Sequence, residues 1–445
     1  MISTSWPFRQ KKKLKKTGHS FGTSVEKTYT PVERLSLGMY VVELDRPWLE
    51  SPFLFQGFEI RSQAQLQAVR NLCGHVYIDT TKTRKIIHHK GVTGNFENNN
   101  LSKAINVENS LPPKKLGTFE KEIVKAEKIY ADTNYLIADF MKQAAQGRHI
   151  DGWLAKKAVA DCVNSVLQSP DALLWLIRLK EKDQHTVQHS LNVCVLAIVF
   201  GRHLNLPEAA MINLGLCGML HDIGKMQIPN RIVNKQAELD SDELRIMQSH
   251  PKLGYELLKS SENIESCVLE TALTHHERLD GTGYPRQLKH ASISDFTKII
   301  SIVSTYDSFI NGRANLNNKT HLEAIHLMTK LVGTKLERKL LIKFIESLGV
   351  YPPGCVVLMT NGAKAMVVEV NERMKLRPKV IMLRDEDGKL IPEQVIDLAN
   401  MAIDRNGNVY TIKNVIRLED CNITPKHYYN PNFMEKRIAI KDLAG

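Results

Sequence analysis

Histidine and aspartate side chains recur in four separated segments between residues 185 and 276. Neutral imidazole and carboxylate are the ligands of choice for divalent first-row metals. Each histidine taken alone is more often an ordinary core or surface residue, so the spacing leaves a metal site and unrelated polar residues as alternatives. The segments are QHTVQHSLNV with His185 and His189, LHDIGK with His221 and Asp222, MQSHPKLGYELL with His250, and HHERLDGTGYP with His275 and His276.

An adjacent His-Asp pair could serve two metal ions at once. His221 could hold one ion while Asp222, which has two carboxylate oxygens, bridges that ion to a second. Two ions about 3.5–4 Å apart can share a hydroxide and direct it at a phosphorus atom. Lys225, three residues after the aspartate, could neutralise charge on a phosphate oxygen. In this interpretation LHDIGK forms part of a metal site.

Helices must position these residues. The two histidines of QHTVQHSLNV are four positions apart, so on a helix both side chains point the same way. LHD follows the apolar segment LGLCGML, and a proline comes directly after His250. Helical periodicity begins at Phe119–Gln146 and continues to about Leu348, after which YPPG ends it. The sequence therefore predicts a helical body that carries the histidines.

Both flanks of this body have the pattern of short strands. Val32–Asp79 alternates apolar and polar residues, with a brief helix predicted at Gln63–Asn71. Thr80–Thr118 is polar and broken, which is typical of a linker. After the helical body, NG and DG turns separate apolar runs and predict two hairpins. The predicted fold class is mainly α, with a small β-rich N-terminal domain and a short β-rich C-terminal segment.

Composition and charge narrow the class of protein. The chain has 445 residues, of which 43% are hydrophobic and 24% are charged, which is typical of a soluble globular protein. No apolar run reaches the ~18–20 residues of a membrane span, and the start lacks the apolar core of a signal peptide. Seven scattered cysteines without a CxxC pair indicate a reducing compartment. We therefore expect a cytoplasmic protein without a membrane span.

The formal net charge of +12 raises the question of a nucleic-acid partner. Much of the excess is a run of lysines, KKKLKK at residues 11–16. Such a run is usually a solvated tail, so we expect no nucleic-acid polymer as partner. The remaining positive charge would suit a small anionic ligand such as a nucleotide.

Four motifs together resemble the HD-GYP domain, in the right order, over roughly Leu179–Leu331. They are HTVQHSLNV, LHDIGK, IPNRIVNKQAELDSDELRIMQSHPKLGYELL and HHERLDGTGYPRQLKHASISDF. The HD-GYP family is a subgroup of the HD metal-dependent phosphohydrolases and degrades cyclic di-GMP. LSLGMYVVELDRPWLESPFLFQGF resembles the small domain often found ahead of HD-GYP modules, and FIESLGVYPPGCVVLMTNGAKAMVVEV resembles the segment that commonly follows them.

The resemblance implies an all-helical phosphohydrolase domain with two divalent transition-metal ions, for which iron and manganese are favoured. Asp222 would bridge the ions and Lys225 would contact the scissile phosphate of a cyclic dinucleotide. The GYP motif would border the site and could contact diguanylate cyclase domains, and Glu277 and Arg278 would lie around the ligands. The implied metal ligands are His189, His221, Asp222, His250, His275 and His276, and the GYP motif is Gly283, Tyr284 and Pro285.

The chain departs from the family pattern at three places. Ser304 stands where the family has an aspartate that ligates the first metal, and Asp307 matches a second aspartate. His185 stands where some members have a glutamate, and either His185 or Asp307 could replace the missing ligand. In the basic run that holds substrate phosphates, Arg313 is retained but Leu316 replaces the second arginine.

These observations favour a phosphodiesterase that hydrolyses cyclic di-GMP, or cyclic GMP–AMP, to a linear dinucleotide or GMP. The alternative is a degenerate module that binds nucleotide or partner proteins without turnover, because of Ser304. The GYP segment argues against a phosphohydrolase of linear nucleotides. The predicted domains are a disordered basic tail (1–30), a β-rich N-terminal regulatory domain with linker (31–140), the HD-GYP phosphohydrolase domain (141–350) and a β-rich C-terminal segment (351–445).

Overall fold

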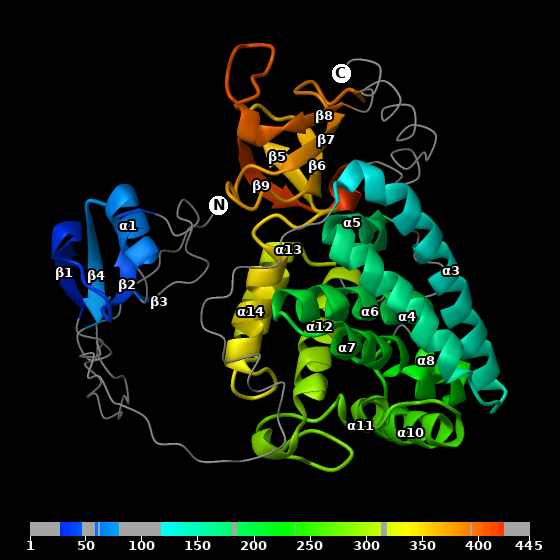
Figure 1. Cartoon of the computed structure of the whole chain (residues 1–445). Coiled ribbons are helices and arrows are strands. Elements are labelled where there is room, and N and C mark those ends of the chain that lie inside the picture. Colours follow the sequence, from blue (N-terminus) through cyan, green and yellow to red (C-terminus); the bar gives the residue numbers. More distant parts are fainter. Residues whose placement is uncertain are drawn as a thin grey trace, which may run out of the picture. The chain divides into compact units, whose positions relative to one another are not determined.

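The computed structural model of the chain describes residues 27–46, 58–60, 63–79, 117–179, 185–235, 237–312, 318–391 and 394–421. The chain divides into two compact units, Met1–Phe96 and Glu97–Gly445. The predicted fold class is confirmed, since helices dominate and strands lie near both ends of the sequence (Figure 1). Of the predicted basic tail, residues 1–26 lie outside the described residues, and residues 27–30 belong to a strand. The predicted linker lies outside them up to residue 116.

The first unit contains an antiparallel sheet and one helix. Strands β1 (Lys27–Pro31), β2 (Tyr40–Leu44), β3 (Phe58–Glu59) and β4 (His75–Asp79) pair in the order β1-β4-β2-β3. Helix α1 (Gln63–Leu72) ends one residue later than the predicted helix. The unit has a core of its own, made of Val32, Leu35, Val41, Leu44, Ile60, Leu66, Val69, Cys73, Val76 and Ile78.

The second unit begins with a helical body. Helix α3 starts inside the range that we assigned to the N-terminal domain and linker, yet it contacts α4, α5 and α6 of this body. The helices are α3 (Phe119–Ala145), α4 (Gly152–Gln168), α5 (Pro170–Leu179), α6 (His185–His203), α7 (Glu208–Leu220), α8 (Asn230–Val233), α9 (Ser241–Met247), α10 (His250–Ser260), α11 (Ser266–Thr274), α12 (Asp295–Asn311), α13 (His321–Thr329) and α14 (Arg338–Leu348).

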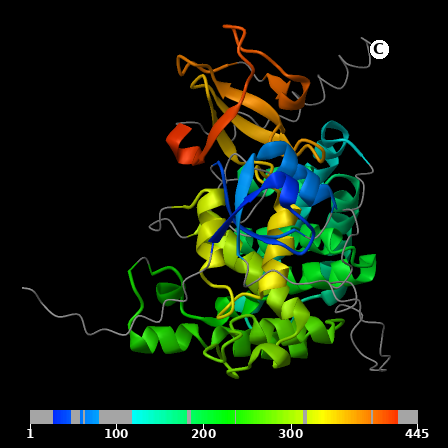
Figure 2. The same ribbon diagram turned by 90° about the vertical axis from the view of Figure 1, so that its left-hand side faces the viewer.

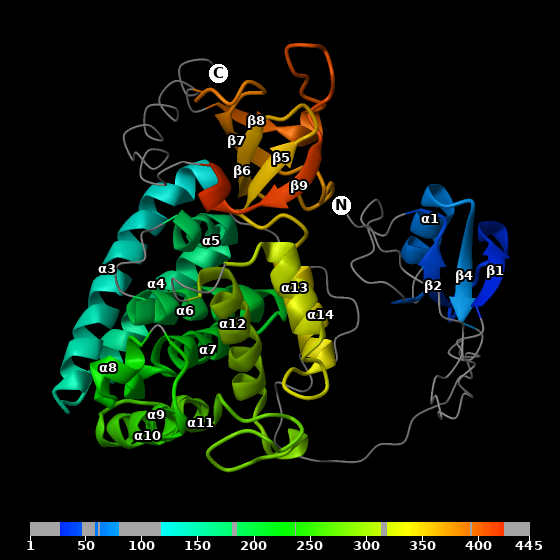
Figure 3. The same ribbon diagram turned by 180° about the vertical axis from the view of Figure 1, so that it is seen from behind.

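Helix α6 is the centre of the helical body. Every residue from His189 to Arg202 is buried, and α3, α4, α5, α7, α12 and α14 all contact this helix. A helix that is apolar on all sides has to be covered on all sides, and the VCVLAIVF run of α6 is apolar throughout. Helix α3 runs along one side of the body, as the opposite views of Figures 1 and 3 show.

The C-terminal strands form one antiparallel sheet at an end of the helical body (Figure 2). Strands β5 (Val356–Met359), β6 (Lys364–Glu369), β7 (Lys379–Arg384), β8 (Val395–Asp397) and β9 (Ile412–Ile416) have the order β8-β7-β6-β5-β9. The glycines of the NG and DG turns, Gly362 and Gly388, have φ angles of 92° and 78°, which glycine adopts without steric cost. Among the described residues, no helix is long and apolar enough to cross a membrane.

Candidate metal centre

The six predicted ligands lie together, mostly at the ends of helices. His189 is on α6, His221 and Asp222 directly follow α7, His250 is the first residue of α10, and His275 and His276 directly follow α11. The C-terminal end of a helix carries a partial negative charge from its unpaired carbonyl groups. The ends of α7 and α11 therefore favour a cation between them.

The glycine of LHDIGK lets α10 approach Asp222 closely. A Cβ atom on Gly224 would lie 2.0 Å from the carbonyl oxygen of His250 and 2.4 Å from the amide nitrogen of Gly254. No side chain fits into that space, so only glycine allows this contact. The contact places the His250 ring against Asp222.

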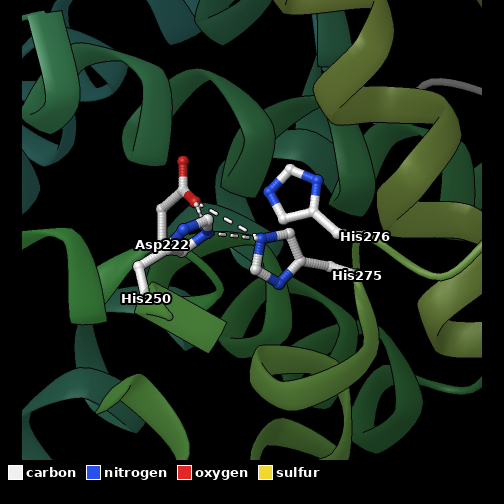
Figure 4. A group of neighbouring side chains, drawn as sticks. All are labelled: Asp222, His250, His275 and His276. Atoms are coloured by element: carbon white, nitrogen blue, oxygen red, sulfur yellow. Dashed lines mark hydrogen bonds and ion pairs between the residues drawn. The ribbon is translucent and has the colours of Figure 1, made fainter. Parts of the chain in front are cut away.

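The two carboxylate oxygens of Asp222 face different histidines. Oδ1 is 3.3 Å from Nε2 of His250 and 3.4 Å from Nε2 of His275, and Figure 4 shows these rings with His276 beside them. Oδ2 is 3.5 Å from Nε2 of His221 and 3.7 Å from Nε2 of His189.

The side chains thus form two groups of possible metal ligands that share the carboxylate, and within each group the ligand atoms lie within 4.8 Å of one another. One oxygen per group is what a bridging carboxylate requires. The groups are Asp222, His250, His275 and His276, and His189, His221 and Asp222.

The histidines present unprotonated nitrogens to this carboxylate. The Nδ1 atoms of His221, His250 and His275 lie 2.9, 2.7 and 3.0 Å from the carbonyl oxygens of residues 218, 247 and 272. A carbonyl oxygen only accepts, so each Nδ1 carries the proton, and in a neutral ring Nε2 keeps its lone pair.

Several acceptors are therefore crowded together without a donor. The Nε2 atoms of His250 and His275 are 3.2 Å apart, and Nε2 of His221 and Oδ1 of Asp222 are buried without a hydrogen-bond partner. Burial lowers the pKa of His221, His275 and His276, which keeps these rings neutral. Lone pairs that converge on an ionised carboxylate fit a divalent metal ion.

Lys225 also contacts the carboxylate of Asp222. Its ammonium donates to Oδ2 of Asp222 at 2.5 Å, from the 3-10 turn Ile223–Gln227 that follows the aspartate. Burial alone would raise the pKa of Asp222, but the adjacent Lys225 ammonium helps to hold it well below its ordinary value. The carboxylate is thus ionised, with the Lys225 ammonium beside it.

Asp307 lies behind His189 and does not join either group of possible ligands. Its Oδ2 accepts from Nδ1 of His189 at 2.7 Å, and its Oδ1 accepts from the side-chain amides of Asn192 and Asn311, each at 2.8 Å. Asp307 therefore orients His189 in the way that carboxylates orient metal-binding histidines. Ser304 lies on the opposite side of the ring, with its Oγ 3.1 Å from Nε2 of His189.

Among the described residues, His185 does not belong to either group of possible ligands. Nε2 of His185 is 3.1 Å from the backbone carbonyl oxygen of Asn311, and the side chain lines a small cavity beside His189, Asn192 and Asp307. Arg313, together with Leu316, lies outside the described residues. Asn192 was missed from the sequence, although it lies three positions after His189 on one face of α6.

The GYP segment packs directly against one of the histidines. The ring of Tyr284 stacks on that of His276, with centroids 4.7 Å apart and an interplanar angle of 15°. A Cβ on Gly283 would lie 2.3 Å from the amide nitrogen of Arg278, so the motif's first residue has to be glycine.

The buried Glu277 holds this segment in place. Its carboxylate accepts from the backbone amides of Arg286 and Leu288 at 2.6 and 2.8 Å. The Arg278 guanidinium extends toward Asp280, at 3.8 Å. Of the two residues predicted around the ligands, Glu277 thus fixes the loop that covers His276.

Three family profiles match the chain. The one described as HD domain matches residues 176–340, one for a domain of unknown function matches residues 28–152, and one described as a KOW domain associated with HD domain matches residues 356–412. The first of these ranges contains all six predicted ligands.

Characterised relatives align with much or part of the chain. A cyclic di-GMP phosphodiesterase of Pseudomonas aeruginosa is 33% identical over 83% of this chain and 88% of its own length. A 3'3'-cGAMP-specific phosphodiesterase of Vibrio cholerae is 33% identical over 35% of this chain and 36% of its own. A solved HDG"Y"P protein from Bdellovibrio bacteriovorus aligns at 17% identity with a TM-score of 0.43, over 72% of this chain and 99% of that one.

Proposed function

This chain belongs to the HD-GYP family of cyclic di-GMP phosphodiesterases, and we propose that it hydrolyses a cyclic dinucleotide at Asp222. The observation that carries the proposal is the carboxylate of Asp222, whose two oxygens face two separate groups of histidines. Cyclic di-GMP is the proposed substrate, because the relative that aligns with most of the chain is named for it.

We propose two divalent ions, iron or manganese, in this site. His189, His221 and Asp222 would hold one ion, and Asp222, His250, His275 and His276 would hold the other. When bound, such ions lower the pKa of a water molecule and stabilise negative charge on a phosphoryl group.

The chain's own residues would perform three tasks. Asp222 keeps the two ligand groups together. The bonds from Nδ1 to backbone carbonyls keep the rings of His221, His250 and His275 from rotating. Lys225 would exchange its contact with Asp222 for a phosphate oxygen and neutralise the charge that grows there. The oxygen of a water molecule would bond to one phosphorus while the bond from that phosphorus to the 3′ oxygen breaks and the 3′ oxygen takes up a proton, which opens the ring to a linear dinucleotide. A second hydrolysis of the same kind would give GMP.

The test pairs metal analysis with product analysis. Protein purified without added metal is assayed for metal per chain and for hydrolysis of cyclic di-GMP and of cyclic GMP–AMP, with Mn²⁺ or Fe²⁺. Asp222→Ala should lose turnover and metal together, because the carboxylate belongs to both groups. The matched control is His326→Gln, at an exposed histidine of α13. Undiminished hydrolysis by Asp222→Ala, or a metal-loaded wild type that cleaves neither nucleotide, would refute the proposal.

A binding module without turnover is the second candidate, and Ser304 is the observation that favours it. A hydroxyl is a weak ligand for a divalent ion, and Ser304 occupies the position beside His189 where the family pattern has an aspartate. In this case the protein would hold at most one ion and would bind cyclic di-GMP without cleaving it. Equilibrium dialysis of labelled nucleotide, followed by chromatography of the bound fraction, distinguishes the two candidates.

A further inference from the structure

A chain of hydrogen bonds runs from helix α3 to the histidine that Asp307 orients. The hydroxyl of Tyr130 donates to Oε1 of Gln188 at 2.8 Å, and Nε2 of Gln188 donates to Oδ1 of Asn192 at 2.6 Å. Nδ2 of Asn192 then donates to Oδ1 of Asp307 at 2.8 Å, and Oδ2 of Asp307 accepts from His189 at 2.7 Å. Tyr130 is 3% exposed, Asn192 0% and Asp307 2%.

The direction of every bond in this chain is set by its neighbours. Reversing the amide of Asn192 would place its oxygen against the carboxylate of Asp307. Reversing the amide of Gln188 would place its oxygen against that of Asn192. Since both reversals oppose two acceptors, the four side chains have one self-consistent arrangement, and it ends with a proton on Nδ1 of His189.

We propose that Tyr130, Gln188 and Asn192 are positioning residues that act on His189 through Asp307. The inference rests on the metal site proposed above, in which Nε2 of His189 is a ligand. A proton held on Nδ1 leaves the lone pair on Nε2, which is directed at Asp222 and Ser304. An ion held by His189, with only a serine hydroxyl beside this imidazole, would depend more on the exact direction of the ring.

The network makes α3 part of the site, although α3 contributes no ligand. This helix contacts both α6, which carries His189, and the turn Ile223–Gln227, which carries Lys225. It is also the first described helix of the second unit. An outward shift of α3 would break the bond between Tyr130 and Gln188 and loosen the ring of His189.

Nearly isosteric substitutions test the positioning role of Tyr130 and Gln188 while every proposed metal ligand stays unchanged. Tyr130→Phe and Gln188→Leu remove one link each, and Tyr135→Phe, at a 77% exposed position of the same helix, is the matched control. Metal-free protein is titrated with Co²⁺ and its visible absorption gives the stepwise affinities. We expect Tyr130→Phe to weaken one Co²⁺ site by about three- to tenfold, less than the about 10–100-fold typical of a direct partner of a ligand. The double variant should bind no more weakly than the weaker single variant, because the links act in series.

A second measurement needs neither metal nor turnover. In metal-free protein labelled with ¹⁵N-histidine, Tyr130→Phe should shift the ring resonances of His189 and Tyr135→Phe should not. If the wild type bound no Co²⁺, the proposed metal centre would fail, and the ring resonances alone would decide this inference. Unchanged His189 resonances together with unchanged Co²⁺ affinities in Tyr130→Phe would overturn it, as would additive losses in the double variant.

Discussion

Replacing Ser304 by aspartate should restore a ligand to the weaker metal position. The Oγ of Ser304 already lies 3.1 Å from Nε2 of His189, so a carboxylate at this position starts within reach of the same ion. A charge-assisted contact contributes about 1.5–3 kcal/mol, which corresponds to a Kd lowered roughly ten- to hundredfold. Without metal, the new carboxylate would instead repel the ionised Asp222 and destabilise the protein.

Thermal unfolding with and without Mn²⁺ measures this change. At equal, saturating Mn²⁺ the tighter binding adds about 1.4–2.7 kcal/mol of stability. Each kcal/mol raises the Tm of a domain of this size by about 2–4 °C, so the Mn²⁺-induced rise in Tm should grow by about 3–11 °C in Ser304→Asp.

The control variant carries the same serine-to-aspartate substitution one helical turn further along α12. Ser308 lies on the same helix and is exposed, so Ser308→Asp adds the same charge away from the ligands. Its Mn²⁺-induced rise in Tm should equal that of the wild type. If the rise in Ser304→Asp did not exceed that of Ser308→Asp, Ser304 would not face a metal position and the assignment of His189 as a ligand would be refuted.

Three further predictions concern Gly224, Tyr284 and the buried histidines of the site. Gly224→Ala should destabilise the protein by about 1–3 kcal/mol in urea unfolding and lower its metal content, because the new methyl group would lie 2.0 Å from a backbone oxygen. Tyr284→Ala should weaken Co²⁺ binding several-fold by removing the ring that stacks on His276, whereas Tyr284→Phe should bind Co²⁺ like the wild type; equal losses in both variants would assign the effect to the hydroxyl. Burial lowers the pKa of His221, His275 and His276 below the ordinary 6.5, so the unfolded chain binds more protons below that value. The metal-free protein should therefore lose stability as the pH falls from 6.5, and His276→Gln should make that loss smaller; a Tm independent of pH between 7 and 5 would contradict the burial of neutral imidazoles.

The fold class could be predicted because its signals are local. Alternation in Val32–Asp79, helical periodicity after Phe119 and the turn dipeptides NG and DG each report the geometry of a few neighbouring residues. The helix predicted at Gln63–Asn71 and the observed α1 differ by one residue at the C-terminal end. The strand at Lys27–Pro31 was missed, because KTYTP has no apolar alternation and its partner β4 lies about fifty residues further along the chain.

The six candidate ligands were expected from the resemblance to the HD-GYP family, because residue types and spacing alone left a metal site and unrelated polar residues as alternatives. The residues around these candidates could not be predicted. Tyr130, Gln188 and Asn192 are ordinary residue types, and their role arises only because α3, α6 and α12 meet at Asp307. The same limit applies to Asp307, since spacing along α12 leaves open whether its carboxylate meets Nε2 or Nδ1 of His189.

His185 and Asp307 were the two candidates to replace the aspartate that is missing at Ser304. Nε2 of His185 lies 3.1 Å from the carbonyl oxygen of Asn311, and the carboxylate of Asp307 accepts from His189, Asn192 and Asn311. Neither side chain belongs to a group of possible ligands. The group around His189 therefore has three possible protein ligands and a serine hydroxyl, and the group around His250 has four possible protein ligands. We expect metal to fill the group around His250 first, with the second ion bound at least about tenfold more weakly, which is the effect of losing about 1.5 kcal/mol of charge-assisted contact. His250→Gln should then remove the tighter step of a Mn²⁺ titration followed by calorimetry, while His189→Gln removes the weaker one. Two steps of equal affinity in the wild type would show that Ser304 does not weaken the ion at the group around His189. Loss of the tighter step in His189→Gln would reverse the expected order of filling.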